Sequence, residues 1–100
     1  LEKKLGPFPL HRFWGPAVSI DSSRWILEAA LEVAARRGPD LLLAYLPHMD
    51  YSLQRSGPGS PEALEHLAQL DALLGPLLDR ALEGGTNLLI LSEYGIAPVS

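Results

Sequence analysis

Polar side chains that can bind a metal or a phosphate follow an apolar stretch in the middle of the chain. Residues 41–46 are Leu-Leu-Leu-Ala-Tyr-Leu, with a proline close by on each side. The polar residues that come next are His48, Asp50, Gln54 and Arg55. A short, unbroken apolar run predicts a strand buried on both faces of a parallel sheet. Because ligands bind beyond the carboxyl ends of such strands, we expect the carboxylate of Asp50 in a functional site.

A second stretch repeats this layout. Residues 87–91 are Asn-Leu-Leu-Ile-Leu and lead into Ser92-Glu93-Tyr94-Gly95, with a long helical pattern between the two stretches. The unit therefore predicts two parallel strands joined by a right-handed helical crossover. Since parallel strands end at the same edge of a sheet, Asp50 and Glu93 should open onto one crevice. Their carboxylates should then lie within about 10 Å of each other, as ligands of metals about 3.5–4 Å apart would require.

Two helices are predicted from capping and stop signals. The first begins at Ser22 or Ser23, with Asp21 and these two serines as good N-caps, and ends at Arg37 before Gly-Pro. The second begins at Ser60, followed by proline and glutamate, and runs to Glu83 before Gly-Gly. A Gly-Pro pair at 75–76 predicts a kink in it, and residues 51–60 are predicted to form a loop.

The predicted fold class is α/β, a fragment of a doubly wound, mainly parallel sheet. Residues 1–20 are expected to be an irregular, proline-rich segment whose aromatic residues Phe8, Phe13 and Trp14 pack on the sheet or on its flanking helix. Residues 21–100 are expected to form an α-β-α-β core. A doubly wound sheet needs four or more strands and this sequence supplies two, which predicts an internal piece of a larger enzyme.

Two motifs resemble those of a known family. Residues 45–58, Tyr-Leu-Pro-His-Met-Asp-Tyr-Ser-Leu-Gln-Arg-Ser-Gly-Pro, are similar to the D-x-x-x-H-x-x-G-P element of nucleotide pyrophosphatase/phosphodiesterases of the alkaline phosphatase superfamily. Residues 92–96, Ser-Glu-Tyr-Gly-Ile, resemble that family's S-D-H-G-M element, in the form carried by an uncharacterised bacterial branch. The resemblance implies a hydrolase of phosphoesters or phosphoanhydrides, with a nucleotide-type small molecule as substrate.

The same resemblance implies that a Thr or Ser nucleophile and a further metal-binding Asp lie upstream, and a final His downstream. No catalytic nucleophile is therefore expected among these 100 residues. We expect the chain alone to be inactive, although the parent protein is expected to be an enzyme. The alternative is a degenerate, non-catalytic domain of the same fold that binds a ligand or a partner.

The resemblance also implies a metal site with an altered set of ligands. Asp50 and residue 54 would bind one zinc and residues 93 and 94 the other, but Gln54 and Tyr94 stand where the family has His, and Glu93 replaces Asp. Amide and phenol oxygens are poorer zinc ligands than imidazole. The cofactor is thus zinc, a harder metal such as magnesium or manganese, or no metal at all.

Two further residues are candidates for contacts with the substrate or with the ligands. His48 could supply the missing imidazole or orient Asp50 from behind. Arg55 could bind a phosphate, or it could be an exposed loop arginine. His66, within the second predicted helix, is expected to be solvated.

Composition excludes several classes of protein. The net charge is −4, from 12 acidic and 8 basic residues, so nucleic-acid binding is not expected. Cysteine is absent, which removes disulfides and thiolate ligands. No membrane span or signal-peptide pattern is found, so no membrane partner is expected and the cytoplasm is favoured. Self-association through exposed sheet edges is expected, because each predicted strand leaves one edge unpaired.

Overall fold

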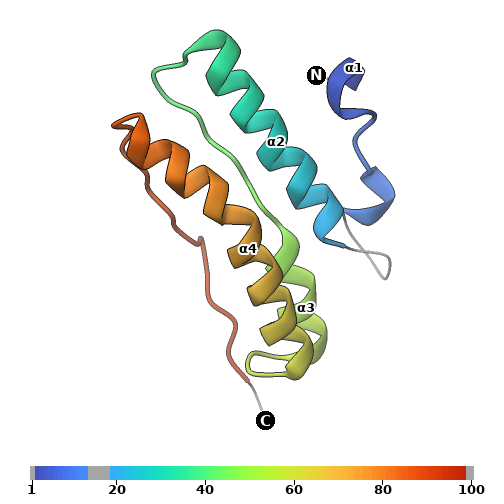
Figure 1. Ribbon diagram of the computed structural model, residues 1–100. Helices are drawn as coiled ribbons and strands as arrows, with labels where there is room; N and C mark the ends of the chain where they lie inside the picture. Colours follow the sequence, from blue (N-terminus) through green and yellow to red (C-terminus); the bar gives the residue numbers. More distant parts are fainter. Residues whose placement is uncertain (1, 14–18, 99–100) are drawn as a thin grey trace.

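The computed structural model describes residues 2–13 and 19–98 as an arrangement of helices and extended segments. The elements in chain order are α1 (Glu2–Leu5), a 3-10 turn η1 (Leu10–Arg12), α2 (Ile20–Arg37), α3 (His48–Ser56) and α4 (Pro61–Glu83). Figure 1 shows α2 and α4 as the two long helices, with α3 at one end of α4 and α1 on the other side of α2. No helix in this part of the chain is long and apolar enough to cross a membrane.

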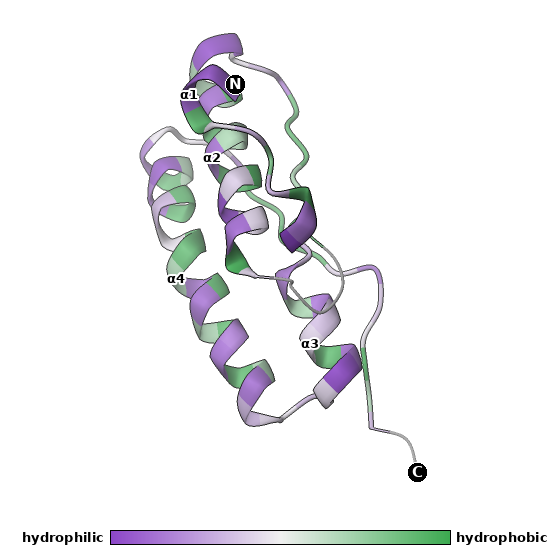
Figure 2. Cartoon of the chain, turned by 90° about the vertical axis from the view of Figure 1, so that its right-hand side faces the viewer, coloured by the Kyte–Doolittle hydropathy of each residue, from purple (hydrophilic) through white to green (hydrophobic). Residues whose placement is uncertain are grey.

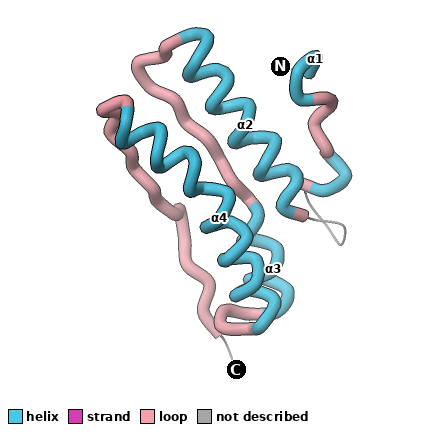
Figure 3. The backbone as a smooth tube through the Cα atoms, viewed as in Figure 1, coloured by secondary structure: helices cyan, strands magenta, loops and turns pink. Residues whose placement is uncertain are grey.

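The predicted α/β fold is wrong, because residues 2–13 and 19–98 contain no strand (Figure 3). The two predicted strands, residues 41–46 and 87–91, are extended, and both run from the same end of the long helices toward the α3 end (Figure 1). No backbone hydrogen bond joins them in the described part of the chain. The apolar pattern was typical of strands buried between neighbours. Two strands alone form at best a marginal pair, so packing between helices prevails.

The two extended segments leave large apolar side chains in water. Leu43 is 83% exposed and Leu89 is 80% exposed, and Figure 2 shows hydrophobic residues along the segment that follows α2. The accessible surface is 7332 Å², whereas a compact monomer of this mass would expose about 5,600 Å². The buried apolar residues in the described part of the chain are Leu27, Ala29, Ala63 and Ala81. The helices therefore share a thin apolar core.

The predicted start and end of the second helix are confirmed. Ser60 caps α4 with its hydroxyl oxygen, which accepts the N–H of Ala63 at 3.1 Å, and Pro61 occupies the first turn. The helix continues through Pro76 to Glu83. The first predicted helix also ends where expected, at Arg37, because Gly38 adopts a left-handed conformation with φ of 53°.

The start of the first helix differs from the prediction. The N-cap of α2 is Ser19, whose hydroxyl oxygen accepts the N–H of Asp21 at 3.3 Å, so the helix begins at Ile20. Ser22 and Ser23, predicted as caps, lie inside the helix and are fully buried. Small side chains at these positions allow the neighbouring elements to approach α2 closely.

The predicted loop over residues 51–60 is also wrong in its first half. Residues His48–Ser56 form α3, and the chain turns only at Gly57, whose φ is 82°. This helix has no side-chain N-cap and mixed polarity, so the sequence carried neither of the usual helix signals.

The N-terminal segment packs on a helix, one of the two surfaces predicted for it. The ring of Phe8 makes edge contacts with Phe13 and Trp25, at centroid distances of 5.6 and 5.3 Å. The indole N–H of Trp25 donates to the carbonyl of Gly6 at 3.0 Å. Residues 2–5 and 10–12 are short helical turns rather than irregular chain. The predicted contact of Trp14 lies outside the described residues.

The capping contact of Ser60 gives a test of the helical fold. Replacing Ser60 by Ala leaves the N–H of Ala63 without its acceptor, which should lower the free energy of unfolding by about 1 kcal/mol. Ser60→Asp keeps an acceptor and should retain the stability of the parent. Urea unfolding followed by circular dichroism measures both. Equal midpoints for the Ala and Asp variants would contradict the assigned cap.

Candidate functional site

Helix α3 carries buried and exposed polar residues on opposite faces. His48 is 1% exposed and Ser52 is fully buried, whereas Asp50 is half-buried and Gln54 is exposed. Residues two positions apart point about 200° apart around a helix, and residues four apart share a face. The chain thus turns His48 and Ser52 toward the other helices and Asp50 and Gln54 outward.

The carboxylate of Asp50 joins the two motifs. Its Oδ1 accepts a hydrogen bond from Nε2 of Gln54 at 3.0 Å, one helical turn away. The same oxygen accepts a hydrogen bond from the hydroxyl of Tyr94, 44 residues further along the chain. This contact brings one residue from each motif together, and it does so without the predicted sheet. The predicted approach of the Asp50 and Glu93 carboxylates stays a prediction.

Tyr94 is held in its neutral form. The hydrogen bond that it donates to Asp50 raises the pKa of its phenol, and burial and the negative charge of that carboxylate act in the same direction. A hydrogen bond that the phenol donates favours its protonated form. The bond therefore contributes fully to the free energy of unfolding below the ordinary tyrosine pKa of about 10. It is lost as the pH rises through the raised pKa of Tyr94.

Glu93 lies beside this contact on the exposed C-terminal segment. The hydroxyl of Ser92 donates to the backbone carbonyl of Tyr94 at 2.6 Å, which closes a local turn around Glu93. The turn holds an exposed carboxylate next to the residue that binds Asp50.

The two other predicted site residues have partners within the fold. His48 faces α4, where its Nε2 lies 2.9 Å from Oε1 of Gln69 and its ring stacks on His66 at 4.5 Å. Burial lowers the pKa of His48, so its imidazole is neutral at pH 7. Arg55 forms an ion pair with Glu62. Its guanidinium also lies 5.1 Å from the centroid of the Tyr51 ring.

Sequence reasoning missed Gln69 and misjudged His66, which was expected to be solvated. His66 follows the buried Ala63 by three residues and precedes Gln69 by three, a spacing that puts all three on one face of α4. The signal was present in the helical periodicity. It was obscured because polar residues are seldom assigned to a helix interface.

The atoms at the Asp50 site that could coordinate a metal are oxygens. No group of three or more His, Cys, Asp or Glu side chains in the described part of the chain is arranged to hold a metal. Gln54 directs its amide N–H₂ at Asp50, which leaves its carbonyl oxygen available. A set of carboxylate, amide and phenol oxygens fits magnesium or manganese better than zinc, which favours imidazole and thiolate as well as carboxylate.

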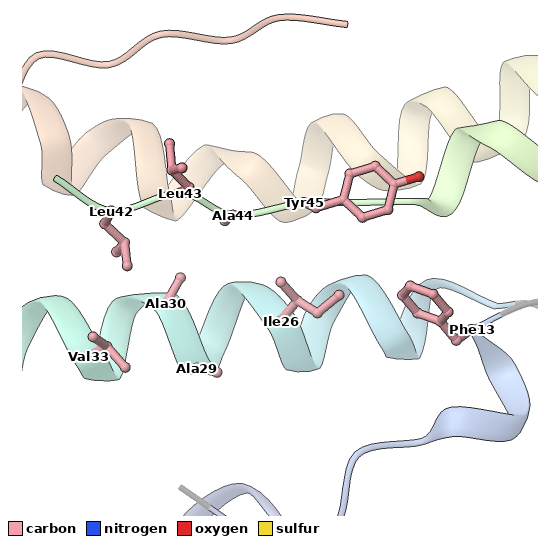
Figure 4. A pocket seen from close by; sticks show the side chains of 9 residues that line it. All are labelled: Phe13, Ile26, Ala29, Ala30, Val33, Leu42, Leu43, Ala44 and Tyr45. Atoms are coloured by element: carbon pink, nitrogen blue, oxygen red, sulfur yellow. The ribbon is translucent and has the colours of Figure 1, made fainter. Parts of the chain in front are cut away.

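A hollow elsewhere in the molecule offers no comparable chemistry. It has a volume of about 360 Å³ and lies between α2 and the extended segment 42–45 (Figure 4). Figure 4 shows Ile26 and Ala30 of α2 pointing toward the extended segment and Leu42 pointing back toward α2. With an apolar lining it is a gap in packing and has no charged group to bind phosphate.

The hydrogen bond between Asp50 and Tyr94 gives a direct test of this geometry. Asp50→Ala removes the acceptor and the charge, so the pKa of Tyr94 should fall toward that of an exposed tyrosine. The difference in ultraviolet absorbance between the chain and its Tyr94→Phe variant follows this phenol through a pH titration.

Glu93→Gln is the matched control, because it removes a neighbouring charge and leaves the hydrogen bond in place. This variant should keep most of the upward shift. An unchanged Tyr94 midpoint in Asp50→Ala would show that the two residues do not meet in solution.

Comparison with known proteins connects this chain to a family. Residues 4–100 match the sequence model of the family described as type I phosphodiesterase / nucleotide pyrophosphatase. An uncharacterized pyrophosphatase/phosphodiesterase of Schizosaccharomyces pombe is 35% identical over 74 residues, which cover 70% of this chain and 15% of that relative. The chain thus spans a small part of the length of this relative. No solved structure matches the chain significantly.

Proposed function

Because the chain belongs to the type I phosphodiesterase / nucleotide pyrophosphatase family, we propose that it forms part of a metal-dependent hydrolase. The proposed substrates are phosphoesters or phosphoanhydrides of the nucleotide type. The observation that carries the proposal is the bond between Asp50 and Tyr94, which unites the two motifs in one polar cluster. A hydrolase of this class needs carboxylates gathered at one place, and this contact supports such a gathering.

The proposed roles follow from the chemistry of each side chain. Asp50 and Glu93 would hold the metal with negative oxygens, assisted by the Gln54 carbonyl and the Tyr94 hydroxyl. A bound divalent ion would polarise a phosphoryl oxygen and offset the charge of the leaving group. Tyr94, being neutral, keeps a proton that it can donate either to Asp50 or to an oxygen of the substrate.

A second candidate function is supported by the same contact. Oδ1 of Asp50 already accepts bonds from Gln54 and Tyr94, so the carboxylate has hydrogen-bond partners without any metal. A cluster satisfied in this way suits a non-catalytic domain that binds a ligand or a partner. Metal binding distinguishes the two candidates.

The proposal predicts that the chain binds Mn²⁺ through Asp50. Titration followed by electron paramagnetic resonance should report saturable binding, and Asp50→Asn should weaken it about tenfold or more, equivalent to about 1.4 kcal/mol. Asp79→Asn removes the same charge from an exposed site on α4 and should leave the affinity unchanged.

Hydrolysis of an activated phosphodiester by the chain alone should not exceed the buffer rate. No nucleophile is assigned among these residues, and loss of a nucleophile lowers the catalytic rate by several orders of magnitude.

The outcomes separate the candidates. Absence of saturable binding for manganese, magnesium and zinc would refute the metal-dependent proposal and favour the non-catalytic domain. Turnover that survives repurification would instead show that the nucleophile lies within these 100 residues.

We also propose that the chain self-associates through its two extended segments. Leu41, Leu43, Leu89 and Leu91 are exposed, and each Å² of apolar surface left in water costs about 25 cal/mol. The backbone groups of both segments are free to pair with another chain. Light scattering at micromolar concentration should therefore report a species larger than the 10.9 kDa monomer.

Leu43→Lys together with Leu89→Lys adds charge to both segments and should shift the population toward monomer. Glu65→Lys, on an exposed position of α4, is the control for added charge and should leave association intact. A monodisperse monomer in the unmodified chain would contradict the proposal.

A further inference from the structure

Helix α3 begins without the usual support. Pro47 precedes it and provides no side-chain cap, and the N–H of Asp50 bonds back to the carbonyl of Pro47 at 3.0 Å. The helix has nine residues, and isolated helices of that length are marginal in water. Contacts with the rest of the fold must therefore fix the orientation of its first turn.

The contact that does so comes from α4. His48, the first residue of α3, is 1% exposed, and its Nε2 lies 2.9 Å from Oε1 of Gln69. An amide oxygen accepts only, so the imidazole Nε2–H is the donor. The ring also stacks on His66, with centroids 4.5 Å apart and planes 22° apart. One hydrogen bond and one ring contact together fix the position and the tilt of the imidazole.

The imidazole depends on these two contacts for its position on α4. Its Nδ1 is buried without a hydrogen-bond partner, so the bond to Gln69 is the side-chain hydrogen bond that holds the ring. Turning the ring over would break this bond and disturb the stack on His66. Loss of the Gln69 acceptor would leave a buried N–H unpaired, which is costly compared with exposing it to water. Removal of Gln69 should thus destabilise the present position of the first turn of α3 relative to arrangements that expose His48 to water.

The orientation of this turn decides where Asp50 points. Asp50 lies two residues after His48 on the opposite face of the same turn, so a rotation of the turn about its axis displaces both side chains together. We infer that Gln69 is a positioning residue for the candidate site, because its hydrogen bond to His48 sets the rotation of α3 that presents Asp50 to Tyr94. The inference rests on the proposed function only in taking Asp50 as the carboxylate of the site.

The sequence makes this inference convenient to test by nuclear magnetic resonance. Gln54 and Gln69 are the only glutamines, so the side-chain amide of Gln54 is readily assigned. Gln54 and Tyr94 both bond to Oδ1 of Asp50, so an Overhauser contact between the Gln54 amide protons and the Tyr94 ring reports the assembled cluster. The measurement is made on the full chain in the presence of a chelator.

Gln69→Met removes the acceptor at similar side-chain length, and the Overhauser contact should be lost. Gln69→Glu retains an oxygen that can accept from His48, and the contact should be retained. Gln69 is only half-buried, so the added carboxylate remains in partial contact with water.

Leu73→Ala is the matched control for loss of stability. Leu73 and Gln69 both line a second hollow, which lies between α2 and α4 and is distinct from that in Figure 4. Leu73 has no polar group that could bond to His48. This variant should unfold at lower urea concentration while keeping the Overhauser contact. A role that was merely structural would affect Leu73→Ala and Gln69→Met alike.

The inference is overturned if the contact persists in Gln69→Met, or if Leu73→Ala loses it to the same degree. Should Gln69→Met not fold, Gln69→Glu decides: a folded variant without the contact overturns the inference, and one with the contact supports it. The Overhauser measurement is made without metal, so its result does not depend on the proposed hydrolase. If the chain fails to bind Mn²⁺, the Overhauser contact still tests the role of Gln69. If the Overhauser contact shows that Gln69 has no such role, the proposal of metal binding is unaffected.

Discussion

The packing of α3 on α4 is the interaction on which the rest of this structure depends. It includes the hydrogen bond between His48 and Gln69 and the stacking of His48 on His66, which are polar contacts at a place where most small domains have leucine or valine. Because these groups are directional, they allow few orientations of α3. An apolar contact of similar area would resist separation but would tolerate rotation. The polar interface therefore favours a defined orientation of Asp50 over maximal stability.

Family membership and the helical fold concern different levels of organisation. The chain matches the family over residues 4–100, and its two motifs meet through Asp50 and Tyr94. They meet through the C-terminal segment, which runs back to α3 without forming a sheet with residues 41–46. The two motifs can therefore meet without the parallel sheet that the sequence predicted.

Local signals in the sequence were sufficient where the cause of structure is local. Ser60 and Gly38 fix helix ends through bonds and dihedral angles within a few residues, and both were predicted correctly. The strands were not, because an apolar run such as Leu41–Leu46 becomes a strand only when other strands pair with it. Helix α3 was missed for the opposite reason: its support comes from Gln69, 21 residues beyond His48. The bond between Asp50 and Tyr94 was not predicted: the matched motifs suggested that Asp50 lies near Glu93, and periodicity says nothing of residues 44 positions apart.

The identity of the most buried side chains has a consequence for the thermodynamics of unfolding. His48, Ser22, Ser23 and Ser52 are the largest fully buried side chains in the described part of the chain, and all are polar. Exposing apolar surface raises the heat capacity on unfolding, whereas exposing polar surface lowers it. The heat-capacity increment should thus fall below the value of about 1.2–1.5 kcal/mol/K usual for 100 residues. The curve of unfolding free energy against temperature should be correspondingly less curved, so that the enthalpy and entropy of unfolding vary less with temperature than in most domains of this size.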